Sequence, residues 1–293
     1  MTPMIHLNMP DFVLGKSAYA YITELRQAHP EAFYDNVDIA SVFGCFYGAT
    51  WNGGGMLIGT NSSKTEVRDT IEFFNNELHI PLRFTFTNCL LEERDCYDRY
   101  CNMIAEVGNN GKNEILTSSP VLEEYLRKTY PNYKFCHSII ATKDHPYDTS
   151  GRYDLVVMKR RMNNNWEYLD SVPMQDRGKI EFLCTDPCPD DCPRLYSHYR
   201  SFARAQLECD HELPDVTCTM QHIRGAFTDL HTTTLETYIS RETIEKEYLP
   251  RGYSQFKLSG RSNLGAIIFN IVNYMVKPEY RQDIVQQLYQ LYL

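Results

Sequence analysis

The sequence predicts an α/β protein built as a (β/α)8-like barrel of the TIM type that carries a cysteine-bearing loop insertion. Short apolar segments of strand composition alternate with amphipathic helical segments along the chain. Seven such strands can be counted, close to the eight of a barrel. The rival architecture is a doubly wound open sheet, whose usual G-x-G-x-x-G turn does not follow the first strong strand.

Composition sets the class of protein. The chain has 293 residues, a net charge of −9 and 43% hydrophobic residues, which is typical of a soluble globular protein. The acidic balance argues against a dedicated nucleic-acid surface, which needs a basic stripe. The longest apolar stretch, residues 264–272, is too short to cross a membrane. The first twelve residues lack the pattern of a signal peptide, so we expect a cytoplasmic protein with reduced cysteines.

The first part of the chain predicts a lead-in and the start of the barrel. Residues 1–36 are expected to form an N-terminal lead-in with a helix over 17–28, which ends at His29-Pro30 because proline disfavours helical geometry in the preceding residue. A single barrel domain is expected over 37–293, since no repeat or linker divides it. Its first strand is predicted at 39–47. Ser63 and Glu66 have the spacing of a capping box, which predicts a helix from there to about residue 78.

The alternation then continues to the end of the chain, and it implies parallel βαβ units. Further strands are predicted over 82–87, 114–117, 134–141, 154–158, 179–183 and 255–259. Helices are predicted over 95–107, 120–130, around Trp166, and over 195–207, 241–248, 264–274 and 278–291.

Three predicted strands have one apolar face and one face that carries a charge. In residues 82–87 the side chains of Leu82, Phe84 and Phe86 share one face and Arg83 lies on the other. Glu181 and Lys257 occupy equivalent positions in their strands. If the apolar faces pack on the helices, these charges project into the barrel interior, where they need partners. Two interpretations stay open, an ion-pair network and a polar cavity for a charged ligand.

The cysteine-rich segment 184–218 carries the most specific signal. Cys184, Cys188 and Cys192 lie within nine residues, and the prolines and aspartates between them place them on a loop just after strand 179–183. Barrel enzymes place their chemistry at this end of their strands. Three thiols can converge on one metal, and either Cys209 or Cys218 can complete a four-thiolate set suited to zinc or an iron–sulfur cluster. Loose free cysteines are the alternative.

Three strand ends supply candidate substrate-binding residues: Asn88, Ser118 and Arg261. An arginine at the rim offers a planar fork for a carboxylate or phosphate, although a salt bridge to a neighbouring loop is an equal interpretation. Asn88 can instead cap the next helix. Neither G-x-S-x-G nor H-E-x-x-H occurs, so peptidase activity of the usual kinds is disfavoured.

The C-terminal region resembles a known family. Residues 251–261 (RGYSQFKLSGR) and 275–280 (MVKPEY) resemble the end of the barrel in the collagenase-like peptidase family, where a strand reads F-K-I-E-G-R. Lys257, Gly260 and Arg261 match that motif, while Ser259 replaces its acidic residue. Well-understood members are oxygen-independent hydroxylases of RNA and of ubiquinone precursors, with a four-iron cluster. The resemblance implies a 4Fe–4S cluster on Cys188 and Cys192, with Cys184 and Cys218 as further ligands and Cys209 in reserve.

The sequence therefore predicts an iron–sulfur barrel enzyme with redox or hydroxylation chemistry on a small-molecule or peptide-borne substrate, which Arg261 and Asn88 orient. The alternative from a different class is a non-catalytic binding or accessory barrel with a structural zinc site. An acidic, tyrosine-rich surface also suits a protein partner subunit, although no residue pattern identifies one.

Overall fold

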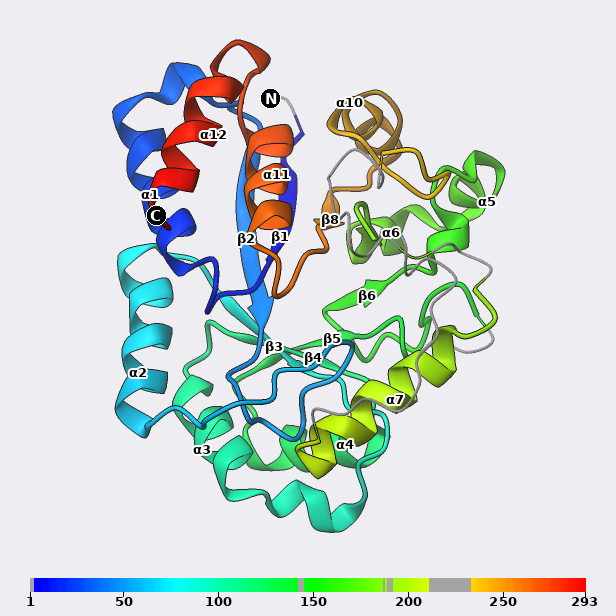
Figure 1. Cartoon of the computed structure of the whole chain (residues 1–293). Coiled ribbons are helices and arrows are strands. Elements are labelled where there is room, and N and C mark those ends of the chain that lie inside the picture. Colours follow the sequence, from blue (N-terminus) through cyan, green and yellow to red (C-terminus); the bar gives the residue numbers. More distant parts are fainter. Residues whose placement is uncertain (1–2, 142–144, 187, 189–191, 211–232) are drawn as a thin grey trace. The chain divides into compact units, whose positions relative to one another are not determined.

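The computed structural model describes residues 3–141, 145–186, 188, 192–210 and 233–293. Eight strands close into a barrel in the order β1 to β8 and alternate with helices, which confirms the predicted (β/α)8 fold. Figure 1 labels these elements along the chain. The strands are β1 (Ile5–Pro10), β2 (Val37–Gly44), β3 (Leu82–Phe86), β4 (Glu114–Thr117), β5 (Lys134–His137), β6 (Leu155–Val157), β7 (Ile180–Leu183) and β8 (Gln255–Lys257).

Strand β1 is the one that the sequence analysis does not predict, and it lies within the segment 1–36 interpreted as a lead-in. Its fourth residue, Asn8, is fully buried and accepts a hydrogen bond from the Ser41 hydroxyl at 2.6 Å. The apolar residues Ile5, Leu7 and Met9 alternate with polar residues, which is the pattern of a strand, and Pro10 ends the segment. The sequence therefore contained a signal for β1 that the interpretation of residues 1–36 as a lead-in did not use.

The chain divides into two compact units, which are described separately. The first comprises Met1–Val42, Arg160–Asp190 and His222–Leu293, and the second Phe43–Lys159 and Asp191–Gln221. Within the first unit β8 pairs in parallel with both β1 and β7. Its helices, as far as they are described, are α1 (Lys16–Ala28), α5 (Trp166–Ser171), α6 (Met174–Arg177), α10 (Arg241–Thr243), α11 (Leu264–Met275) and α12 (Arg281–Gln290).

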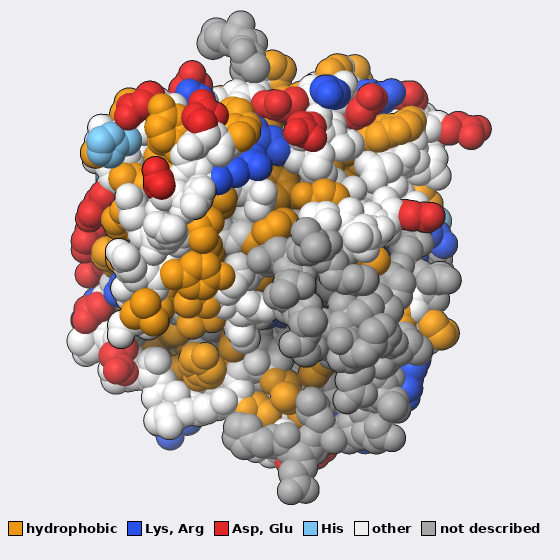
Figure 2. All heavy atoms as spheres, turned by 45° about the horizontal axis from the view of Figure 1, so that its top comes forward, with side chains coloured by type: hydrophobic (Ala, Val, Ile, Leu, Met, Phe, Trp, Pro, Cys, Tyr) orange, Lys and Arg blue, Asp and Glu red, His pale blue; other side chains and the backbone are white. Residues whose placement is uncertain are grey.

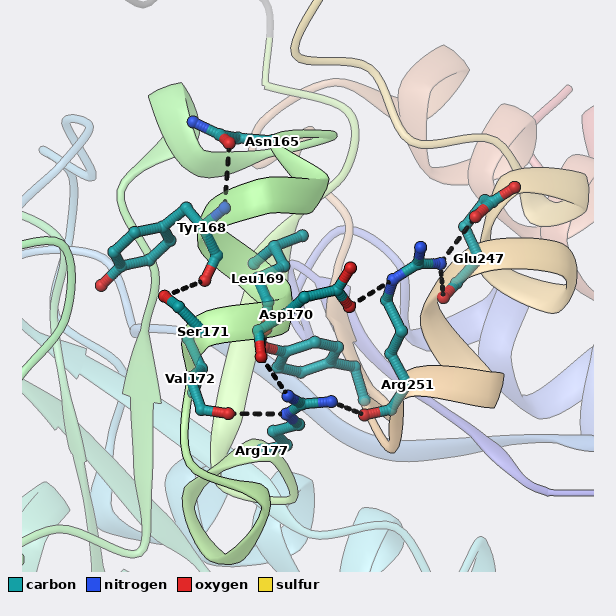
Figure 3. Close-up of polar contacts among 10 residues, drawn as sticks. Asn165, Tyr168, Leu169, Asp170, Ser171, Val172, Arg177, Glu247 and Arg251 are labelled. Carbon is teal, nitrogen blue, oxygen red and sulfur yellow. Dashed lines mark hydrogen bonds and ion pairs between the residues drawn. The ribbon is translucent and has the colours of Figure 1, made fainter.

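An arginine network ties α5 and α6 of the first unit to the segment before β8 (Figure 3). Arg177 donates three hydrogen bonds to main-chain carbonyls, to Val172 at 2.9 Å and to Asp170 and Arg251 at 2.8 Å each. Arg251 pairs with Asp170 at 2.9 Å and with Glu247 at 2.6 Å. Because Arg177 is buried and its acceptors are backbone atoms, this network fixes the path of the chain.

The second unit consists of strands β3 to β6 with α2 (Lys64–Glu72), α3 (Arg99–Gly108), α4 (Pro120–Thr129) and α7 (Leu195–Glu208). The predicted capping box is present, since Glu66 N–H donates to Ser63 Oγ at 3.2 Å and Ser63 N–H to Glu66 Oε2 at 2.6 Å. The predicted helix over 95–107 is interrupted at Asp98, whose carboxylate accepts from Cys101 N–H at 2.7 Å. Asp98 thereby caps α3 as a separate helix.

The ion-pair interpretation holds for the first of the predicted interior charges. Arg83 and Glu114 are register partners on β3 and β4, and Arg83 Nε lies 2.6 Å from Glu114 Oε2. The Arg83 side chain is fully buried and that of Glu114 is 10% exposed. Glu181 and Lys257, on β7 and β8, are buried as well.

The sequence analysis also predicted an acidic balance of surface charge and no apolar stretch long enough to cross a membrane. On the face drawn in Figure 2, Asp and Glu side chains of the described residues are interspersed with Lys and Arg along the rim. Among the described helices, none combines the length and apolar character that a membrane span requires.

Candidate functional site

A cavity of about 1220 Å³ opens in the second unit, and all of its lining residues belong to that unit. They come from the carboxyl ends of β3, β4 and β5, from the start of α4, from the segment before β6 and from the first half of α7. Those with side chains suited to chemistry include Cys89, Thr117, Ser118, His137, Tyr153 and Arg200.

Strand register sets Thr117 and His137 side by side. They are partners on the parallel strands β4 and β5, so their side chains project from the same face of the sheet, about 5 Å apart in backbone spacing. Side-chain alternation places them on the face of Phe135, which packs under Arg127 of α4 at 4.1 Å. The cavity therefore lies on the helix-facing side of the strand ends, whereas Arg83 and Glu114 occupy the opposite face.

His137 is a buried imidazole held against an aromatic ring. Its ring centroid lies 4.7 Å from that of Tyr153. Burial lowers the pKa of His137 below its ordinary value, and the weaker attraction of Asp148 and Glu123 opposes that shift. The imidazole is therefore neutral at pH 7 and can accept a proton from a group bound in the cavity.

Glu123 of α4 organises the wall beside His137. Its Oε1 accepts from Arg127 at 2.8 Å and from Arg152 at 3.2 Å, and its Oε2 accepts from the Tyr153 hydroxyl at 2.7 Å. Burial, and then the hydrogen bond to Glu123, raises the pKa of Tyr153, so this hydroxyl stays protonated as a donor. A buried carboxylate with both oxygens occupied holds three side chains in place.

The start of α4 forms another part of the wall. Ser119 caps the helix by accepting from Leu122 N–H at 3.4 Å, and Pro120 occupies the first helical position. The Ser118 hydroxyl donates to Thr87 O at 2.9 Å. The Thr117 hydroxyl is buried and has no hydrogen-bond partner among the described residues. A hydroxyl of this kind at a cavity wall is available to a ligand.

Helix α7 covers the cavity with Tyr196, Tyr199 and Arg200, near α4 in Figure 1. Its second half is anchored by Gln206, which accepts from Leu57 N–H at 2.8 Å and donates to Ala49 O at 3.0 Å. Asn88 adds a hydrogen bond to Ala203 O at 3.0 Å. These bonds fix the helix that carries the aromatic residues.

Of the three predicted substrate-binding residues, Ser118 lines the cavity. Asn88 is fully buried, donates to Thr50 O at 2.9 Å as well as to Ala203, and accepts from Leu90 N–H at 3.0 Å. The side-chain amide of Asn88 is therefore engaged by main-chain groups of three other residues. Arg261 follows β8 in the first unit and is not among the residues that line the cavity.

The predicted cysteine ligands are placed differently from one another. Cys184 follows β7 directly and is fully buried, with Sγ 3.6 Å from Phe182 O. Burial raises its thiol pKa well above the ordinary value, which opposes the thiolate form that metals bind. Cys188 and Cys192 are partly exposed, and Cys209 is exposed at the end of α7. Cys218 lies outside the described residues.

Within the described ranges, no three Cys, His, Asp or Glu side chains are grouped so that they could hold a metal ion. Arg160 orders the loop before Cys188, since it pairs with Asp186 at 2.9 Å and donates to Cys188 O at 3.3 Å. The 4Fe–4S and zinc assignments stay predictions.

Sequence reasoning missed Thr117, Glu123, His137 and Tyr153 as a group. Two features of the sequence could have pointed to parts of this group. His137 shares a strand face with Phe135, and Glu123 and Arg127 have the i, i+4 spacing of an ion pair on a predicted helix. What the sequence does not contain is the register that sets Thr117 beside His137.

The fold and the cavity define a (β/α)8-barrel protein with a polar site at the ends of β4 and β5. No model of a known protein family matches the chain. No curated protein matches it either. Among solved structures, the U32 peptidase Mk0906 is similar with a TM-score of 0.45 and 12% identity, over 76% of this chain and 85% of that chain. This similarity is distant and assigns no activity or residue role, so the resemblance of residues 251–261 to the collagenase-like peptidase family stays a prediction.

Proposed function

We propose that this protein is a barrel enzyme that binds a small-molecule or peptide-borne substrate in the cavity of the second unit and moves a proton at His137. One observation carries the proposal: a buried imidazole with a lowered pKa lines a large cavity at the end of β5. Active sites of (β/α)8 enzymes lie at this end of the strands. A general base works best when its pKa lies near the working pH and the base is unprotonated there.

The surrounding residues supply the other functions of such a site. His137 Nδ1 or Nε2 accepts the proton. Thr117 and Ser118 line the same cavity at the end of β4, so their hydroxyls can orient the substrate beside His137. Tyr153, fixed by Glu123, keeps the imidazole ring in one orientation. Tyr196 and Tyr199 on α7 provide aromatic surface for an organic ligand. The volume of about 1220 Å³ exceeds that of a typical small-ligand pocket.

The test begins with ligands. Thermal-shift measurements on the full chain identify stabilising compounds among carboxylic acids, phosphorylated metabolites and short peptides, because a bound ligand stabilises the folded state. Each such compound is then followed by proton NMR in D2O, which reveals conversion or exchange of a C–H proton.

We expect His137→Asn to keep ligand binding and to lose conversion. The matched control is His145→Asn, an exposed histidine that does not line the cavity. Equal conversion by wild type and His137→Asn would remove the base role, and so would the absence of conversion of every stabilising ligand.

We further propose, as a second candidate, that the cysteine segment binds a 4Fe–4S cluster or a zinc ion. One observation favours it: β7 ends at Leu183, so Cys184 and the loop with Cys188 leave the barrel at the carboxyl end of a strand. Cys188 and Cys192 are partly exposed, and Cys218 or the exposed Cys209 would join them. A cluster would supply one-electron redox chemistry for hydroxylation, and zinc would supply folding energy.

Metal analysis of protein purified under nitrogen separates these cases. A cluster gives absorbance near about 400 nm with matching iron and sulfide contents. Stoichiometric zinc in a colourless protein supports the structural site, and Cys188→Ser then unfolds the barrel. Neither metal at stoichiometric level contradicts both versions. A cytoplasmic location and a protein partner subunit are further proposals.

A further inference from the structure

We infer that the cavity of the second unit receives an anionic group of its ligand, a carboxylate or a phosphate, at the N-terminus of α4. The inference deepens the proposed function, since it names the substrate class for the same site. It is drawn from the charges in the wall, from a buried hydroxyl and from the helix terminus, taken in that order.

The wall carries as many arginines as glutamates although the whole chain is acidic, and one of the glutamates is already engaged. Glu123 is already paired with Arg127 and Arg152, and both of its oxygens accept hydrogen bonds. Arg200 lines the cavity and has no ion pair among the described residues. The lining thus holds two arginines, Arg152 and Arg200, and two glutamates, Glu123 and the exposed Glu124.

The guanidinium group of Arg152 also has N–H donors that Glu123 does not engage. Its side chain is 62% exposed, and only Nη2 contacts Glu123, at 3.2 Å. Guanidinium groups bind carboxylates and phosphates through paired N–H donors. Arg152 and Arg200 therefore offer the fork geometry that an anion needs, whereas the carboxylate of Glu123 is already engaged by three donors.

The Thr117 hydroxyl is the independent observation that points to a ligand. Thr117 is 1% exposed, lines the cavity, and its Oγ1 has no hydrogen-bond partner among the described residues. A buried hydroxyl without a partner is costly, so such groups normally meet a ligand or water. As the register partner of His137, this hydroxyl lies next to the proposed base.

The first turn of α4 supplies a further donor and a favourable field. Pro120 has no N–H, and Ser119 already accepts from Leu122 N–H. The Val121 N–H is left without an acceptor among the described residues. The N-terminus of a ten-residue helix carries partial positive charge and favours an anion. Val121 N–H and the Arg200 guanidinium present donors only, and the Thr117 hydroxyl can donate as well, so this combination favours an anionic group.

Calorimetric titration of the full chain tests the inference with two probes, inorganic phosphate and propionate. We expect at least one of them to bind to wild type, and the one that binds identifies the anion as phosphate or carboxylate. Thr117→Val keeps the shape and strand propensity and removes the hydroxyl, and Arg200→Gln removes the charge. Each is expected to weaken anion binding by about tenfold.

The matched control is Arg204→Gln. Arg204 is exposed, lies one turn further along α7 and does not line the cavity, so its replacement should change affinity less than about twofold. Circular dichroism confirms that each variant is folded. The inference is overturned if neither probe binds to wild type, or if Thr117→Val and Arg200→Gln bind as well as Arg204→Gln does.

His137→Asn separates this inference from the proposed function, because anion binding does not require a base. If this variant binds the probe and still converts substrates, the proposed function fails and the anion site stands. If it loses conversion while Thr117→Val and Arg200→Gln bind the probes normally, the anion site fails and the base role stands.

Discussion

Two arginine networks, one in each unit, differ in what stands at their centre. Around α5 and α6 the centre is Arg177, and its three bonds end on main-chain carbonyls. Around α4 the centre is Glu123, and its three bonds come from side chains that border a cavity. The first arrangement fixes backbone and so supports the fold. The second fixes side chains around a space, which is the arrangement expected of a binding site.

The largest effect is expected from breaking the second network. Glu123→Ala leaves two arginines without their buried partner and Tyr153 without its acceptor, which should lower the free energy of unfolding by about 3 kcal/mol. Ligand-induced stabilisation should vanish as well. Urea unfolding and thermal-shift titration measure the two effects. Retained ligand binding would mean that Glu123 does not organise the cavity.

Arg177→Ala is the counterpart in the first network. It leaves three main-chain carbonyls without a donor, and a loss of about 2 kcal/mol in the free energy of unfolding is expected. Ligand conversion by the folded fraction should stay at the wild-type level. A folded Arg177→Ala protein with impaired conversion would contradict the division between a structural and a functional network.

Thr117→Val should change stability in the opposite direction. Removing a buried hydroxyl that has no partner is expected to raise the free energy of unfolding by about 1 kcal/mol in the absence of ligand. Urea unfolding with and without the anion checks this, because the anion should stabilise wild type more than the variant. Marked destabilisation would show that the hydroxyl has a structural partner.

Arg251→Gln sharpens the comparison at the solvent-exposed edge of the first network. Its partners Asp170 and Glu247 are 56% and 42% exposed, so the loss should stay below about 1 kcal/mol. A loss as large as that of Arg177→Ala would contradict the view that backbone acceptors carry this network. Both variants are compared in the same urea series.

The smallest effect concerns the dependence of stability on pH, and its sign differs between two histidines. The pKa of His137 is lowered by burial, so its contribution to stability is present above the ordinary value of 6.5 and is lost as the pH falls from there through the lowered pKa. The hydrogen bond to Asp38 raises the pKa of His6, so that contribution is present below 6.5 and is lost as the pH rises through the raised pKa.

Thermal unfolding of wild type, His137→Asn and His6→Asn between pH 5 and 8 checks both signs. His137→Asn should reduce the loss of stability in acid, and His6→Asn should reduce the loss toward neutral pH. Identical pH profiles for all three proteins would show that neither histidine has a shifted pKa.

The sequence predicted those parts of the fold that local chemistry determines. The strand at Glu114–Thr117 and the capping box of Ser63 and Glu66 follow from residue pattern alone. Strand β1 was missed although Ile5, Leu7 and Met9 alternate with polar residues, and the Ser41 hydroxyl that donates to its buried Asn8 lies 33 residues away. The helix predicted over 95–107 was too long because Asp98 competes for backbone N–H groups and caps α3.

The site was harder to predict than the fold for a related reason. Ser118 was expected at a strand end and does line the cavity. The adjacency of Thr117 and His137 depends on strand register, and the convergence of Arg127, Arg152 and Tyr153 on Glu123 joins residues up to 30 positions apart. Asn88 was equally expected to bind the substrate, but its side-chain amide donates to the main-chain carbonyls of Thr50 and Ala203.

NMR titration of the His137 Cε1–H signal, assigned with His137→Asn, tests the central claim most directly, namely that a neutral imidazole faces a cavity that binds anions. The account predicts a pKa of His137 below the ordinary 6.5 that rises when the bound anion, phosphate or propionate, is added. A pKa of 6.5 or above that stays unchanged with both anions would contradict it.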